Sequence, residues 1–381
     1  MPKEMWTLSD NDFGKLLKYI KDDTITDIDY NGRSLWINDI YNNRRQADVE
    51  VEPQEMENFA ARVANRANKK FDPVNNRLAA QTNNLRISCL HETQTTTGIS
   101  VCIRKSPPIV RLTPKEAVKM GFMTKKTLAF IINCVMAKCN FVTVGEPQVG
   151  KTELSKFIMQ FIPDNQRVIT IEDVPELHYH EIKPTADCVD IIVGDNLTYT
   201  DAIKTCLRQN PNWIMLSEAR STEVKYLIEC WTTGVHGMTT LHTDDVRKIP
   251  DRIVNMSASE LKTRIENDVF VNVDLGILVK KKTLYDGKII RYIDQIAIFS
   301  RNRNKNSVTL LLDEGEPTGE EVNSELLKKL RAVGITDPFS NNYVDSIFSD
   351  EEENDKWKSK KENIPKDNRV QNLLNSLGEN V

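Results

Sequence analysis

The feature that most constrains this chain is a glycine-rich loop between an apolar run and a helix-compatible run. Residues 141–144 read FVTV, and they predict a short buried strand. The next residues read GEPQVGKT, which matches the GxxxxGK[ST] loop in the strand–loop–helix setting that this loop requires. Its glycines let backbone N–H groups turn inward around an anion, and the start of the next helix adds positive potential. The predicted nucleotide-binding residues are Gly145, Glu146, Pro147, Gln148, Val149, Gly150, Lys151, Thr152 and Glu153.

The same loop indicates its ligands. Lys151 follows the second glycine, where a lysine reaches the β- and γ-phosphates of a bound nucleotide. The hydroxyl of Thr152 stands where it binds Mg²⁺. We therefore predict ATP and Mg²⁺ as the cofactors.

Three further apolar runs each end in side chains suited to phosphate chemistry. Residues 168–171 precede Glu172 and Glu176, residues 213–216 precede Glu218 and Arg220, and residues 238–241 precede His242. These runs alternate with helical patterns, which is typical of a parallel sheet covered on both faces. Ligands of open α/β sheets bind outside the carboxyl ends of the strands. The pattern therefore predicts that one sheet edge gathers these side chains beside the glycine-rich loop.

Taken in order, the loop and three later segments resemble the Walker A, Asp box, Walker B and His box series of the type II/type IV secretion ATPases, a superfamily that includes pilus motors and conjugation ATPases. The three segments are ITIEDVPEL, LRQNPNWIMLSEAR and TGVHGMTTLHTDD. His242 matches the His box, whereas Val235 stands where the family usually has a histidine and His236 comes one residue later. The four-cysteine zinc insert of some type II relatives is missing, which favours the type IV secretion, conjugation and Flp-pilus-type branch.

The resemblance implies a RecA-like ATPase in a ring of six subunits, with ATP between two domains. It implies that Glu218 holds the Mg²⁺ shell together with Thr152, or polarises water. Glu172 or Glu176 would orient or deprotonate the attacking water, and His242 would sense the γ-phosphate. The spacing does not decide which carboxylate is the base. The candidates for stabilising transition-state charge, in the same subunit or across a subunit boundary, are Arg104, Arg208 and Arg220.

A proline-containing break divides the chain. Upstream of it we expect a hairpin at Asn31-Gly32, a helix over 53–68 and two strands around 85–89 and 99–103, which together make a small α+β unit. The break reads KSPP at residues 105–108, and proline disfavours helix before it. Arg86 and Arg104 lie on the two predicted strands, where the resemblance implies that arginines close the N-terminal domain over the nucleotide.

The predicted fold class is α/β. A RecA-like P-loop ATPase domain lies downstream of the break and is preceded by a smaller α+β N-terminal domain. Asp286-Gly287 lies between the apolar runs 269–280 and 288–299, which predicts a tight turn and an antiparallel addition to the sheet. The predicted limits are 1–104 for the N-terminal domain, 105–112 for the linker, 113–300 for the ATPase domain, 301–348 for a C-terminal extension and 349–381 for a charged, disordered tail.

Composition restricts the partners. The 51 basic and 55 acidic residues give a formal net charge of −4, so no global positive field holds nucleic acid, and direct nucleic-acid binding is not expected. The start, MPKEMWTLSDND, lacks the apolar core of a signal peptide, and polar residues interrupt the most apolar long stretch, 127–144, so we expect neither export nor a membrane span. The seven cysteines lack paired CxxC spacing and indicate buried thiols in a reducing compartment. We expect a cytoplasmic homo-hexamer, peripheral at the membrane through inner-membrane components of a secretion or pilus machine.

Two other functions remain open at this level. RecA-like rings also drive helicases and DNA translocases, but the acidic balance and the missing aromatic-basic groove disfavour a nucleic-acid motor. An ATP-binding scaffold that assembles a membrane complex without turnover is the non-enzymatic alternative. The presence of Lys151, Thr152 and Glu218 disfavours the scaffold.

Overall fold

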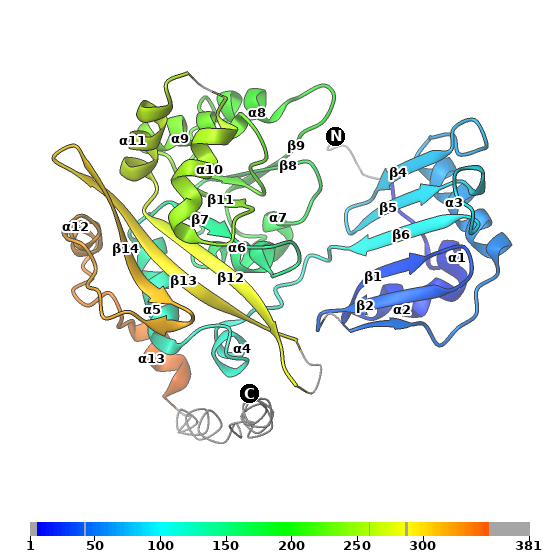
Figure 1. The fold of residues 1–381 in the computed structure, drawn as a ribbon, viewed down its shortest axis with the longest axis horizontal. Coiled ribbons are helices and arrows are strands. Elements are labelled where there is room, and N and C mark those ends of the chain that lie inside the picture. Colours follow the sequence, from blue (N-terminus) through cyan, green and yellow to red (C-terminus); the bar gives the residue numbers. More distant parts are fainter. Residues whose placement is uncertain (1–5, 42, 259, 286–288, 350–381) are drawn as a thin grey trace, which may run out of the picture.

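Two β-sheets joined by an extended segment organise the chain (Figure 1). The computed structural model describes residues 6–41, 43–258, 260–285 and 289–349. Within these residues the first sheet contains six strands, here called the N-terminal sheet, and the second contains nine, here called the large sheet. The tail predicted over 349–381 lies outside the described residues apart from its first position.

The N-terminal sheet is antiparallel throughout, in the order β3-β2-β1-β6-β5-β4. Buried and exposed residues alternate along β5, so that one face of the sheet packs on the helices and the other stays polar. The strands are β1 Ile25–Tyr30, β2 Leu35–Asp39, β3 Arg44–Gln46, β4 Arg77–Gln81, β5 Leu85–Leu90 and β6 Ser100–Lys105. The helices are α1 Asp10–Phe13, α2 Leu17–Lys21 and α3 Pro53–Arg66.

Three local predictions for this region are confirmed. β1 and β2 form the hairpin around Asn31-Gly32, with Tyr30 paired to Leu35. The predicted helix is α3, which buries Met56, Phe59, Ala60 and Val63. The predicted strands are β5 and β6, which pair antiparallel.

The large sheet is parallel at its centre, in the order β15-β14-β13-β12-β7-β11-β10-β8-β9. Strands β12, β7, β11, β10, β8 and β9 run parallel, which confirms the predicted α/β class. They are β7 Phe141–Val144, β8 Val168–Glu172, β9 Cys188–Ile192, β10 Trp213–Leu216, β11 His236–Leu241 and β12 Leu275–Thr283.

Helices cover both faces of the large sheet (Figure 1). Adjacent residues of β7 point to opposite sides, because Phe141 packs in one hydrophobic core and Val142 in the other. The core around Phe141 also contains residues of α4 Pro114–Lys119, α5 Lys125–Met136, α6 Lys151–Met159, α7 Tyr179–Ile182, α12 Ser324–Ala332 and α13 Asn342–Phe348. The core around Val142 contains residues of α8 Tyr199–Cys206, α9 Glu223–Thr232, α10 Ile249–Met256 and α11 Lys262–Asn272.

An antiparallel hairpin extends the sheet on one side, as predicted. β12 pairs antiparallel with β13 Ile289–Asn302 over its whole length, whereas the predicted turn at Asp286-Gly287 lies outside the described residues. The sheet then continues beyond residue 300 through β14 Lys305–Asp313 and β15 Glu316–Pro317. Short 3₁₀ turns complete the described elements at Gly14–Leu16, Glu92–Gln94 and Val246–Lys248.

All seven cysteines lie in described residues and are free thiols, of which Cys102 is exposed and Cys188 half-buried. Among the helices of the described ranges, none combines the length and the apolar character that a membrane crossing needs.

Gly237 allows β10 and β11 to approach closely, and we predict that Gly237→Ala destabilises the fold. An added Cβ would lie 2.0 Å from the carbonyl oxygen of Ile214 and 2.9 Å from Nε1 of Trp231, so two paired strands would have to separate. We expect a loss of about 3 kcal/mol or more in the free energy of unfolding, at the upper end for overpacking. Denaturant unfolding measures it. The matched control is Gly194→Ala, because a Cβ there meets nothing within 4 Å; equal stability of the two variants would contradict the prediction.

Candidate functional site

The glycine-rich loop connects the buried strand β7 to helix α6, as predicted. Gly145 has φ 145°, and a Cβ at this position would lie 2.4 Å from the carbonyl oxygen of Val279 on β12. Gly150 has φ 102° and immediately precedes the helix. Both positions therefore require glycine, the first for a close approach of two backbones and the second for a left-handed turn. The loop ends at the N-terminus of α6, whose free N–H groups favour an anion.

Lys151 folds back over the loop. Its Nζ donates to the carbonyl oxygens of Gly145 and Glu146, both at 2.9 Å, and lies 3.2 Å from Nδ1 of His242. Burial lowers the pKa of Lys151 to about 8, while the charge of Glu218 acts in the opposite direction. The ammonium group of Lys151 thus lies against the glycine-rich loop, where its positive charge is poorly solvated and favours the binding of an anion.

His242 connects Lys151 to a row of alternating acidic and basic side chains. Its Nε2 lies 2.7 Å from Oε1 of Glu218. The other oxygen of Glu218 accepts from Nε and Nη2 of Arg220 at 2.9 and 2.7 Å. Arg220 in turn donates to Asp173 at 2.7 Å. The ends of β7, β8, β10 and β11 are therefore linked side chain to side chain, which is the gathering that the sequence predicted.

The two candidate water-activating carboxylates occupy different environments. Glu172 is only 2% exposed, and its oxygens accept from the backbone N–H groups of Glu176 and Leu177 at 3.0–3.3 Å. Burial raises the pKa of Glu172 to about 8, against the effect of these hydrogen bonds. Glu176 instead accepts from the hydroxyl of Thr152 at 3.4 Å. Burial also raises the pKa of Glu176, while Arg104 and Lys156 lower it. Glu172 thus orders the segment that follows β8, and Glu176 faces the hydroxyl of Thr152.

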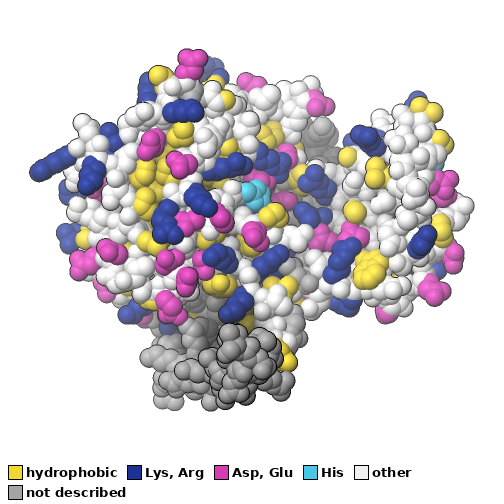
Figure 2. All heavy atoms as spheres, in the orientation of Figure 1, with side chains coloured by type: hydrophobic (Ala, Val, Ile, Leu, Met, Phe, Trp, Pro, Cys, Tyr) yellow, Lys and Arg dark blue, Asp and Glu magenta, His cyan; other side chains and the backbone are white. Residues whose placement is uncertain are grey.

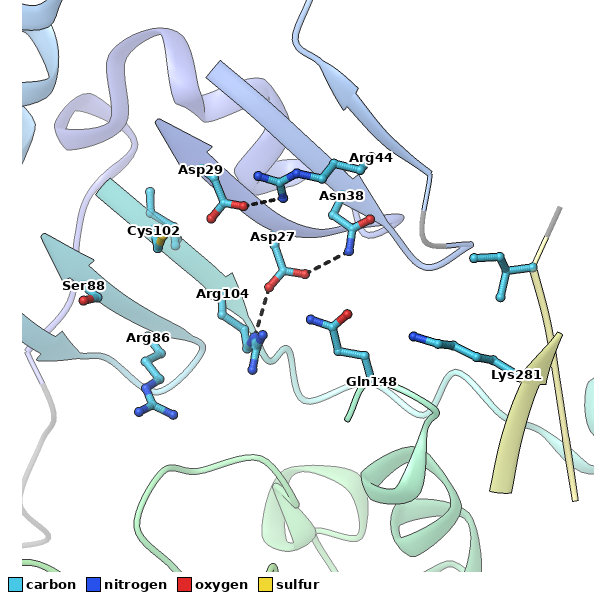
Figure 3. Close-up of a pocket in the computed structure, with 12 residues that line it drawn as sticks. Asp27, Asp29, Asn38, Arg44, Arg86, Ser88, Cys102, Arg104, Gln148 and Lys281 are labelled. Carbon is cyan, nitrogen blue, oxygen red and sulfur yellow. Dashed lines mark hydrogen bonds and ion pairs between the residues drawn. The ribbon is translucent and has the colours of Figure 1, made fainter. Parts of the chain in front are cut away.

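A cleft of about 670 Å³ lies between the polar face of the N-terminal sheet and the glycine-rich loop. In Figure 3, Arg104 projects from β6 into this cleft and Gln148 approaches it from the loop. Arg104 donates through Nε to Asp27 at 3.0 Å. The cleft is also lined by Arg86 and by Lys281 of β12. The structure thus brings Arg104 to the loop from another sheet, and Figure 2 shows basic and acidic side chains interleaved over this face of the molecule.

Arg208 is the one predicted arginine that lies elsewhere. It lines a second cleft, of about 490 Å³, together with Arg167 and Asn212. Arg167 and Asn212 directly precede β8 and β10, so this cleft lies at the amino ends of parallel strands whose carboxyl ends carry Glu172 and Glu218. Arg208 is therefore on the opposite edge of the sheet from the glycine-rich loop of its own chain.

Sequence reasoning missed several basic residues near the loop. Arg291 of β13 donates through Nε to the carbonyl oxygen of Gln148 at 3.4 Å. Arg111 lies 3.8 Å from Glu153, and the buried Lys156 donates to the carbonyl oxygen of Pro107 at 3.2 Å. None of the three belongs to a motif, and Arg291 is far from the loop in sequence. Only the pairing of β12 with β13 brings Arg291 to the loop.

Comparison with known proteins gives consistent matches. The family model described as type II/IV secretion system protein matches residues 56–274, more than half of the chain. An uncharacterized protein of Bacillus anthracis is 30% identical over 301 residues, covering 75% of this chain and 68% of that protein. The type IV secretion system protein VirB11 of Brucella suis is 31% identical over 201 residues, covering 44% of this chain and about half, 53%, of that protein.

A solved structure shares the fold. The X-ray structure of the Legionella pneumophila ATPase DotB aligns with a TM-score of 0.56 at 18% identity, covering 78% of this chain and 83% of that chain. At this identity the likeness concerns the fold alone. It agrees with the predicted class, a RecA-like α/β domain preceded by a smaller α+β domain.

The environment of Glu172 predicts a pH dependence of stability. Its pKa rises from an ordinary value of 4.5 to about 8 in the folded chain, so the folded state keeps a proton that the unfolded state releases. The contribution of Glu172 to the free energy of unfolding is fully present below about pH 4.5. It is lost as the pH rises toward about 8, by up to about 1.4 kcal/mol per pH unit.

We therefore expect Glu172→Gln to flatten the fall in Tm between about pH 5 and pH 8. Thermal unfolding by circular dichroism at both pH values measures it. The matched control is Glu229→Gln, at an exposed glutamate of α9. A variant at Glu172 that follows the wild-type pH profile would show that its carboxyl group is not the source of the dependence.

Proposed function

Because the chain belongs to the type II/IV secretion system protein family, we propose that it is an ATP-hydrolysing motor subunit. Six copies would form a ring that powers a type IV or type II secretion, conjugation or pilus-like machine at the cytoplasmic face of the membrane. The reaction is ATP and water to ADP and phosphate. The partners would be inner-membrane components of that machine, in keeping with the name of VirB11 as a type IV secretion system protein.

One observation carries this proposal. His242 lies between Lys151, at 3.2 Å, and Glu218, at 2.7 Å. The imidazole of His242 thus connects Lys151, which would bind the β- and γ-phosphates, to the carboxylate of Glu218, which follows β10. When a γ-phosphate draws Lys151 away from the imidazole, His242 loses one of its partners. This is the means by which His242 would sense the γ-phosphate.

The oxygen donors at this point suit Mg²⁺. Thr152 offers a hydroxyl and Glu218 a carboxylate, with Glu176 within 3.4 Å of the hydroxyl, and Mg²⁺ prefers such hard oxygen ligands. Thr152 and Glu218 would hold the ion, which would offset the negative charge of the phosphates. Of the two candidate bases we favour Glu176, because the oxygens of Glu172 already accept from two backbone N–H groups.

The arginines would act at different places. Arg220 pairs with Glu218 and Asp173 beside the site. A shift of Glu218, the proposed Mg²⁺ ligand, would therefore also move the guanidinium group of Arg220. Arg104 approaches from the N-terminal sheet across the cleft. Arg208 lies at the far edge of the large sheet and would serve the loop of a neighbouring subunit. We propose residues 1–104 and 113–300 as the two domains that enclose the nucleotide, with 105–112 as the linker.

The first test of this function is Lys151→Ala, which removes the only loop side chain placed to neutralise the β- and γ-phosphates. We expect the rate of ATP hydrolysis to fall by about 10²–10³-fold or more, as for other preorganised charge-stabilising groups. Phosphate release in the presence of Mg²⁺ measures the rate. The matched control is Lys204→Ala, at an exposed lysine on α8. Hydrolysis by the Lys151 variant at the wild-type rate would refute the assignment of the loop.

The second test concerns Arg208 as a residue acting in trans. Lys151→Ala and Arg208→Ala subunits should each be inactive alone, because an arginine at the transferring phosphoryl group is worth about 10³–10⁵ in rate. Mixed at ring-forming concentration, some interfaces combine an intact loop with an intact Arg208, so part of the activity should return. Native mass spectrometry checks that mixed rings form. Mixed rings without recovered activity would exclude the trans role, and an active Arg208→Ala subunit would exclude any catalytic role.

A further inference from the structure

A group of metal-ligating side chains lies away from the glycine-rich loop. His180 and Glu181 belong to α7, and Asp190 belongs to β9, the edge strand of the large sheet. One ligand atom from each of the three lies within 4.8 Å of the others. Nδ1 of His180 contacts Oδ2 of Asp190 and lies 3.3 Å from Oε2 of Glu181. Nothing in the proposed ATPase site uses these residues.

This group has more lone pairs than hydrogen-bond donors. Oε2 of Glu181 is buried and has no hydrogen-bond partner. In the described residues, the ion pairs of Glu181 and Asp190 are with histidines and none is with a lysine or an arginine. A single N–H on His180 can serve Asp190 or Glu181 but not both. A buried carboxylate oxygen without a donor is costly, and a bound cation is one way to satisfy it.

A neighbouring histidine also lies near this oxygen. Nε2 of His178 lies 2.7 Å from the carbonyl oxygen of Ser106. Its Nδ1 lies 3.3 Å from the same Oε2 of Glu181. His178 is not one of the three grouped side chains.

A hydrogen bond orients the carboxylate of Asp190. Thr170 of β8 donates to Oδ1 of Asp190 at 2.6 Å, which leaves Oδ2 directed to His180. Hydrogen bonds of this kind fix the orientation of ligating carboxylates. Ligands bound tetrahedrally at about 2.0–2.2 Å lie about 3.3–3.6 Å apart, which is the separation of Nδ1 of His180 from Oε2 of Glu181, at 3.3 Å. Nδ1 of His180 and Oδ2 of Asp190 are closer than this, so an ion has to draw these two side chains apart.

We propose that His180, Glu181 and Asp190 form a binding site for a divalent transition-metal ion of the zinc class. Imidazole and carboxylate ligands suit zinc, and three protein ligands leave a fourth position for water. The exposed side chain of His180 gives the ion access from solvent. Bound there, the ion fastens α7, and with it the end of the segment that follows β8 and carries Glu176, to the edge strand β9. The proposal does not depend on ATP hydrolysis.

The experiment uses the full chain, stripped of metal with a chelator and kept free of nucleotide. Zn²⁺ alone is titrated in competition with a chromophoric chelator. We expect one equivalent to bind, with affinity reduced at least about tenfold in His180→Ala and in Asp190→Asn. Zn²⁺ should raise the Tm of the wild type and not that of either variant. The matched controls are Asp187→Asn, whose carboxylate pairs with Arg167 at 2.9 Å, and His91→Ala in the N-terminal sheet region.

Three outcomes would overturn the assignment. The first is a wild-type chain that binds no stoichiometric Zn²⁺, and the second is full affinity in both site variants. The third is loss of binding in Glu218→Gln, which would place the ion beside the glycine-rich loop. Substitution by Co²⁺ provides a second readout: visible d–d bands without a thiolate charge-transfer band support histidine and carboxylate ligands, whereas a thiolate band would assign the ion to a cysteine and refute the site.

Discussion

The parallel pairing of β7 with its neighbours is the constraint on which the rest of the site depends. Val144 pairs with Leu241, and Leu216 pairs with both Thr239 and Ile171. The strands therefore end almost level, and whatever follows each of them comes to the same edge. A one-residue shift in any of these registers would turn a buried strand residue toward the opposite core. Packing on both faces thus holds the loop, the carboxylates and the histidine in place together.

Burial separates residues that look equivalent in the sequence. Glu172 and Glu176 are four positions apart, yet Glu172 is buried and accepts from the backbone N–H groups of Glu176 and Leu177, whereas Glu176 reaches the hydroxyl of Thr152. Burial also lowers the pKa of Lys151. In the same buried position its ammonium group donates to the backbone of the glycine-rich loop. The chemistry of each group follows from how much water its charge loses and which partners replace that water.

The segment after β6 connects this site to the N-terminal sheet. Ser106 and Pro107 offer their carbonyl oxygens to His178, which precedes α7, and to Lys156 of α6. On the other side, Lys105 donates to the carbonyl oxygens of Tyr19 and Asp22 at 3.0 and 2.6 Å. These hydrogen bonds tie the N-terminal sheet to α6 and to the segment that follows Glu176. The proposed metal ligands lie directly beyond that segment.

The sequence by itself determined the elements and the order in which they deliver chemistry. The strand–loop–helix around Gly145, the strand that ends before His242 and the hairpin of β12 and β13 were all predictable, because hydrophobic period, glycine and turn residues act over a few neighbouring positions. The tertiary structure alone decided which side chains meet. It separates Arg208 from the loop, brings Arg291 to it, encloses Glu172 and gathers His180 with Asp190. These contacts join segments between ten and more than a hundred residues apart, and they arise only when the sheet registers and the two cores form.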